Sequence, residues 1–178
     1  MKDRDESTLA MALNQEKMER VLHRDREELE LERQIEKLGN KTSSPKKRKE
    51  RVEMIKKISR KYYEIANDMV EDAQYSEAID LYSKSISIMR KVGNVKPADS
   101  YFNRAITLAM MGYPRMALDD LNKIVKANPP KADVYFVKGQ IFQSMGKDKL
   151  AEREYRKCLK IDPEFYRASR SLENLRIK

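Results

Sequence analysis

Side chains that could serve as a nucleophile, a general base or a metal ligand are few in this sequence. The 178 residues include one histidine, His23, and one cysteine, Cys158, far apart in the chain. A nucleophilic thiol needs a neighbouring base, and a zinc site needs several His or Cys residues at fixed spacing. The sequence has no HExxH or CxxC motif and no glycine-rich phosphate loop of the GxGxxG or GxxxxGK[ST] type. We therefore predict a non-enzymatic protein with no catalytic residue, no metal and no cofactor.

The remaining chemistry that the sequence concentrates in one place is positive charge. Residues 41–61 hold ten Lys or Arg and two acidic residues. The run Lys46, Lys47, Arg48 and Lys49, followed by Arg51, resembles a nuclear-import signal. It could equally contact an acidic surface such as nucleic acid or tubulin, or be the solvated face of a helix. No aromatic residue interrupts residues 41–61, so base stacking has no support.

The composition predicts a helical protein and indicates how its N-terminal part is organised. Charged residues make up 38% of the chain, with only 5 Gly and 6 Pro, which favours long helices with wide solvated faces. Residues 1–39 read as a charged helical arm without a continuous coiled-coil seam, and residues 40–56 read as a basic hinge. A single cysteine fits a reducing compartment, and no apolar run approaches the length of a membrane span. We expect a cytoplasmic protein.

A repeat occupies the rest of the chain. Ala78, Ala117 and Ala151 are separated by 39 and 34 residues, and similar residues surround each of them. Each repeat has an aromatic residue, then a small one, a large apolar one and a second large one after the alanine. These are Tyr62, Tyr101 and Tyr135; Ala66, Ala105 and Gly139; Met69, Leu108 and Phe142; and Tyr82, Leu121 and Tyr155. Pro129 and Pro163 close the second and third repeats.

This pattern resembles the tetratricopeptide-repeat (TPR) family over about two-thirds of the chain. The resemblance implies an all-α solenoid of three helix-turn-helix repeats at 57–91, 98–130 and 132–163. Small residues allow the two helices of a repeat to approach closely, and Gly112 and Gly146 allow the chain to turn. Residues 164–178 are expected to form a capping helix with one apolar face, because the last repeat needs a neighbour.

The resemblance also implies a concave groove lined by the first helix of each repeat. The inward residues that we expect to contact a partner are Tyr63, Asn67, Phe102, Asn103, Ile106, Met110, Phe136 and Gln140. Tyr63, Phe102 and Phe136 are equivalent and would form an aromatic stripe suited to a helix or an extended peptide. The alternative is that these rings pack within the domain or under the N-terminal arm.

Some TPR grooves hold the acidic C-terminal tails of Hsp90 and Hsp70 chaperones through two Asn and three Lys or Arg. Asn67 and Asn103 match the two asparagines. Tyr63, Asp133 and Val137 stand at the three basic positions, and a carboxylate pair needs cations there. Binding of such tails in the standard way is therefore not expected.

Together these features predict an adaptor that binds other proteins in its groove, in the manner of a co-chaperone or an assembly factor for a cytoskeletal or ciliary complex. One alternative is a docking protein of microtubules or axonemes, attached through the arm and residues 41–61. A second alternative is a nuclear factor associated with nucleic acid. No membrane partner is expected.

The repeat register makes a prediction about stability. Ala151 should lie where two helices touch, so Ala151→Leu should overpack the crossing and lower the free energy of unfolding by about 1–3 kcal/mol. Chemical denaturation of the wild type and the variant measures this difference. Equal stabilities would mean that the register of the third repeat is wrong.

Overall fold

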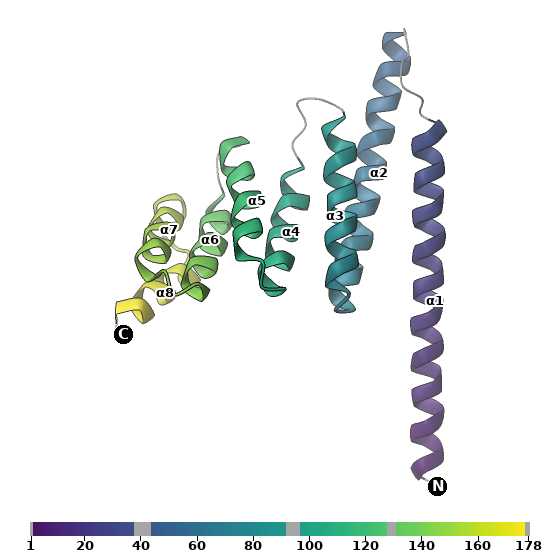
Figure 1. Cartoon of the computed structure of the whole chain (residues 1–178), viewed down its shortest axis with the longest axis horizontal. Helices are drawn as coiled ribbons and strands as arrows, with labels where there is room; N and C mark the ends of the chain where they lie inside the picture. The colour runs from purple at the N-terminus through teal and green to yellow at the C-terminus, as the bar shows by residue number, and fades with distance from the viewer. Residues whose placement is uncertain (1, 38–43, 92–96, 128–130, 177–178) are drawn as a thin grey trace. The chain divides into compact units, whose positions relative to one another are not determined.

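The structure is a computed structural model that describes residues 2–37, 44–91, 97–127 and 131–176, and every regular element in these ranges is a helix (Figure 1). The chain divides into two compact units, Met1–Ile58 and Ser59–Lys178. No helix in the described ranges is both long enough and apolar enough to cross a bilayer.

The first unit contains helix α1 (Lys2–Lys37) and the beginning of helix α2 (Pro45–Glu71). Helix α1 confirms the expected N-terminal helix and carries polar pairs one turn apart, such as Gln34 with Glu30 at 3.2 Å. The His23 side chain is 72% exposed and lies 3.7 Å from Glu27, so it belongs to the solvated surface. Leu31 and Ile55 are buried.

The expectation of a hinge over residues 40–56 is wrong from Pro45 onward. Pro45 is the first residue of α2, a position that suits proline because its N–H would have no helical partner and its φ is already helical. No Gly or Pro interrupts the next 26 residues, so the basic run continues into the first repeat as helix. Residues 40–43 lie outside the described ranges.

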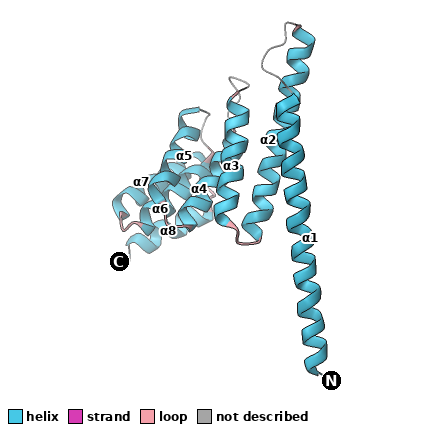
Figure 2. Ribbon diagram, turned by 45° about the vertical axis from the view of Figure 1, so that its right-hand side comes forward, coloured by secondary structure: helices cyan, strands magenta, loops and turns pink. Residues whose placement is uncertain are grey.

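The second unit is a row of antiparallel helices in which each described helix from α3 onward packs on the next (Figures 1 and 2). The end of α2 pairs with α3, α4 with α5, and α6 with α7, and α8 then packs on α7. Their bounds are α3 Tyr75–Arg90, α4 Ala98–Met110, α5 Pro114–Ala127, α6 Ala132–Ser144, α7 Asp148–Ile161 and α8 Tyr166–Arg176. This is the expected solenoid with its capping helix.

The turns within the repeats share one backbone conformation. Gly112 and Gly146 have φ values of 81° and 68°, in the left-handed region that glycine adopts without steric cost. Ala73 occupies the equivalent place in the first repeat with φ 58°, although its Cβ makes this conformation less favourable. All three repeats therefore turn in the same way, and the first does so under some strain.

The small residues lie at the helix crossings as predicted. Ala78, Ala117 and Ala151 are fully buried. At the crossing of α6 and α7 even Ala would not fit, because a Cβ built on Gly139 would overlap the Tyr155 ring. Phe165, Leu172 and Leu175 of the C-terminal segment pack against the cluster that contains Ala151 and Tyr155, so the apolar face predicted after Pro163 covers the last repeat.

Buried ion pairs link the two helices of the second and third repeats. In the second, Arg104 donates to both carboxylate oxygens of Asp120, at 2.7 and 2.9 Å, and Lys123 also contacts Asp120. In the third, 34 residues later, Lys138 lies 3.3 Å from Glu154 and Lys157 lies 2.9 Å from it. Only 3% of the Asp120 side chain and 1% of the Glu154 side chain are exposed.

The first repeat replaces this ion pair by apolar residues. The positions equivalent to Arg104 and Asp120 are Ile65 and Leu81, which are 2% and 3% exposed. One lysine is retained, because Lys84 lies over the Tyr62 ring much as Lys123 lies over Tyr101, at 5.8 and 5.2 Å. Equivalent positions between the two helices of a repeat thus hold either a buried ion pair or two apolar side chains.

This comparison predicts that the ion pair of the third repeat can be exchanged for the apolar pair of the first. Lys138→Ile alone should lower the free energy of unfolding by about 3 kcal/mol, because Glu154 stays buried without its partner on α6. The double variant Lys138→Ile/Glu154→Leu should return to within about 1 kcal/mol of the wild type. Thermal and urea unfolding measure both values. A double variant as unstable as the single one would contradict the prediction.

The pH dependence provides an independent check of the same pair. Burial raises the pKa of Glu154, but the hydrogen bond from Lys157 and the charges of Lys138 and Lys157 outweigh it, so the pKa lies below the ordinary 4.5. A lowered pKa stabilises the fold above pH 4.5, and this contribution is lost as the pH falls through the folded value. The double variant should therefore lose less stability in acid than the wild type.

Candidate functional site

A groove runs along the first helices of the three repeats within the second unit. Its first part, of about 550 Å³, is lined from α2, α4, α5 and α6 and by the segment before α6. Its second part, of about 500 Å³, is lined mainly from α4 and α6, which contact each other directly. Phe102 and Asp133 line both parts, so we treat them as one continuous groove.

Three of the predicted site residues, Tyr63, Phe102 and Asn103, line the first part of the groove. Asn67 is absent from its lining and lies behind Asn103, to which it is hydrogen-bonded. Each of the four side chains is half-buried. The Tyr63 and Phe102 rings and the Asn103 amide therefore line the same space.

A chain of hydrogen bonds connects the polar groups at this end of the groove. Asn103 Nδ2 donates to Asn67 Oδ1 at 2.9 Å and to the Tyr63 hydroxyl at 3.1 Å. Asn67 Oδ1 also accepts the Tyr82 hydroxyl at 2.6 Å. An amide nitrogen has two hydrogens, so both donors of Asn103 are used within the protein. Burial raises the pKa of Tyr82 to about 12, so this hydroxyl stays protonated and donates.

The second part of the groove contains Ile106, Met110, Phe136 and Gln140, the other predicted site residues. Met110 is 58% exposed and Gln140 is also exposed, whereas Ile106 is half-buried. Phe136 departs from the expected aromatic stripe, because it is only 4% exposed. Its ring packs against Tyr155 and Phe165, with centroid separations of 5.8 and 5.1 Å, so it is mainly a core residue.

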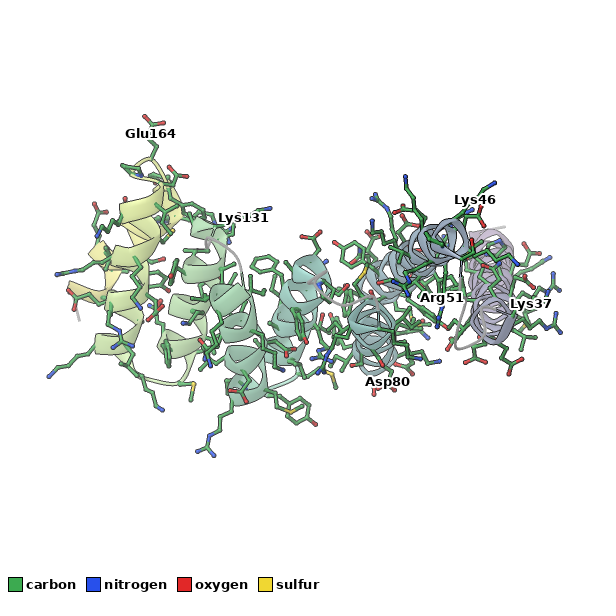
Figure 3. The ribbon with its side chains drawn as sticks, turned by 90° about the horizontal axis from the view of Figure 1, so that it is seen from above. Lys37, Lys46, Arg51, Asp80, Lys131 and Glu164 are labelled. Carbon is green, nitrogen blue, oxygen red and sulfur yellow. The ribbon has the colours of Figure 1, made fainter. Side chains whose placement is uncertain are left out.

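Charged side chains also line the groove. Asp99 and Asp133, both exposed, lie in the first turns of α4 and α6. Lys131, labelled in Figure 3, precedes α6 and lines the first part. Arg167 of α8 lies over the Phe136 ring at 4.6 Å and lines the second part. The repeat register places Asp99 and Asp133 at inward positions of their helices, whereas nothing in the sequence indicated Arg167.

The basic residues form a separate feature. Lys46, Lys47, Arg48 and Lys49 are all exposed around the first turns of α2, and Arg51 is half-buried (Figure 3 labels Lys46 and Arg51). Acidic residues are absent from the first turn of this helix. These cations therefore lie at the N-terminus of α2, which the helix dipole already makes positive. The interaction between these charges and the dipole is unfavourable.

Reactive chemistry is not assembled in the described ranges. Cys158 is fully buried, as predicted, and burial raises the pKa of its thiol to about 11, so it is held in the unreactive thiol form. No group of three His, Cys, Asp or Glu side chains in these ranges could hold a metal ion.

Comparison with known sequences agrees with the repeat register. Residues 132–165 match the model of the tetratricopeptide repeat family. The 58 kDa phosphoprotein of Plasmodium berghei is 30% identical over 113 residues, covering 64% of this chain and 25% of that protein. The human DnaJ homolog subfamily C member 7 is 28% identical over 119 residues, covering 67% and 23%. The chain thus spans about a quarter of the length of these relatives.

Solved structures agree with the fold. The TPR domain of Arabidopsis OM64 has a TM-score of 0.62 and 22% identity, covering 68% of this chain and 97% of that domain. The first TPR of Spaghetti (RPAP3), bound to the HSP90 peptide SRMEEVD, has a TM-score of 0.58 and 22% identity, covering 66% and 89%. Residues 132–165 thus match a tetratricopeptide repeat, and the chain has the fold of a TPR solenoid.

Proposed function

We propose that this protein is a non-enzymatic adaptor that binds a segment of a partner protein in the groove defined above. The observation that carries the proposal is the pair of adjoining pockets, which share Phe102 and Asp133 and have half-buried apolar and aromatic side chains in their lining. TPR folds are protein-binding modules, and a half-buried aromatic residue such as Phe102 is a typical anchor for an extended peptide or a helix.

A role alongside chaperones is the finer form of this proposal. Its support is the similarity to a DnaJ homolog and to a TPR domain solved with an HSP90 peptide. The alternatives, a docking protein of microtubules or axonemes and a nuclear factor, depend on the exposed basic residues of α2. The groove favours the adaptor, because it offers a shaped apolar surface that a purely electrostatic contact does not need.

Site-specific photo-crosslinking tests the adaptor function. A photoreactive residue at Gln140, which is exposed and lines the groove, should crosslink to a defined segment of a partner protein. The same group at Asn122, exposed on α5 and outside the groove lining, is the matched control and should not.

The captured segment, made as a synthetic peptide, should bind the wild type in a fluorescence titration. Ile106→Asp should weaken this binding by at least about tenfold, because it places a charge in an apolar contact. Equal crosslinking from both positions, or unchanged affinity in the variant, would mean that the groove is not the binding site.

Acidic chaperone tails provide the second test. The peptide SRMEEVD should not bind the wild type at micromolar concentration, because Asn103 has no N–H to spare and Asp133 repels carboxylates. Tyr63→Lys/Asp133→Lys/Val137→Arg should create binding, because all three positions line the groove. Isothermal titration calorimetry measures both.

A control variant separates local from overall charge. Met116→Lys/Asp119→Lys/Asn122→Arg adds the same charge at exposed positions of α5 outside the groove lining and should not create binding. Micromolar binding by the wild type, abolished by substitution of Asn67 and Asn103, would contradict the prediction.

A further inference from the structure

We infer that the groove selects partner segments that carry a lysine or arginine between apolar residues, an inference that rests on the proposed function. It concerns the chemical class of the ligand. The groove offers such a segment acceptors and carboxylates, and both amide donors of Asn103 are already used within the protein.

The Asn103 amide hydrogens in the first part of the groove are already used in hydrogen bonds within the protein. Asn103 uses both amide hydrogens on Asn67 and Tyr63, at 2.9 and 3.1 Å, and Tyr82 gives its hydroxyl hydrogen to Asn67. Only the carbonyl side of the Asn103 amide is left to a ligand, and a carbonyl oxygen accepts. An acidic segment would have to break these bonds to reach the Asn103 amide hydrogens, whereas an ammonium or guanidinium group can use the carbonyl as it stands.

The charges of the lining act in the same direction. Asp133 lines both parts of the groove, so a ligand that extends from one part to the other passes its carboxylate. Asp99 adds a second carboxylate in the first part. Each cation, by contrast, lines one part only, and Arg167 is stacked on the Phe136 ring.

Apolar contacts on both sides of Asp133 define the rest of the ligand. Phe102 is shared by the two parts, and Ile106, Val137 and Met110 continue the apolar lining of the second part. A segment with apolar residues flanking a basic one would therefore bury its apolar side chains while its charge meets the carboxylates.

Three fluorescent peptides of equal length test this inference by polarisation. They share Leu and Phe anchors and differ only in the central pair of residues, which is Lys, Gln or Glu. The Lys peptide should bind the wild type about tenfold more tightly than the Gln peptide, and the Glu peptide should bind most weakly. The preference for Lys should shrink as the salt concentration rises from about 0.05 to about 0.3 M.

Matched variants identify the carboxylates responsible. Asp99→Asn/Asp133→Asn should remove the preference, whereas Asp119→Asn, which removes an exposed carboxylate of α5 outside the groove lining, should keep it. Circular dichroism confirms that both variants remain folded. Equal or tighter binding of the Glu peptide, absence of Lys-peptide binding, or a preference that survives the double substitution would overturn the inference.

The two proposals fail in distinguishable ways. If a partner segment crosslinks through Gln140 but proves acidic or uncharged, the adaptor function stands and the selectivity for basic segments is wrong. If crosslinking does not depend on the groove, the adaptor function itself is wrong.

Discussion

The distance between the two helices of each repeat is the constraint on which the other features of the second unit depend. Buried alanines at the crossings let the backbones approach closely, and at Gly139 the contact with the Tyr155 ring leaves no room for a Cβ. A larger residue would push the helices apart and tilt the next pair. The shared left-handed turns then return the chain in the same direction each time. Because the helix spacing and the turn conformation are the same in each repeat, the first helices of neighbouring repeats lie side by side and line the groove.

Polar groups are arranged so that this close packing does not leave them without partners. In the second and third repeats a buried carboxylate accepts hydrogen bonds from cations that also lie over a tyrosine ring. Ile65 and Leu81 show that the fold does not require these charges at this position. A row of buried serine hydroxyls, from Ser59 through Ser85 to Ser100, links α2, α3 and α4 with contacts of 2.9 Å. The ion pairs and the serine hydrogen bonds each give partners to polar atoms that would otherwise be buried without a hydrogen bond, which would destabilise the fold.

Features that the repeat pattern sets could be predicted from the sequence, whereas features that depend on residues outside the pattern could not. The repeats could be found because Ala117 and Ala151 mark a regular period, and the groove positions follow from that register. Phe136 was misplaced because its burial depends on Phe165, which belongs to the end of the array and has no counterpart in the inner repeats. The helical state of the basic segment was missed because Ser-Pro followed by a lysine run has the composition of a linker, whereas Pro45 is a helix start.

The self-contained hydrogen bonding of Asn67 and Asn103 affects what happens when the groove is empty. A binding site built from several cations holds like charges together at a cost until an anion arrives. Here the tyrosine and asparagine side chains are already each other's partners, with short contacts and no net charge. These side chains can therefore keep this end of the groove preorganised when no ligand is bound.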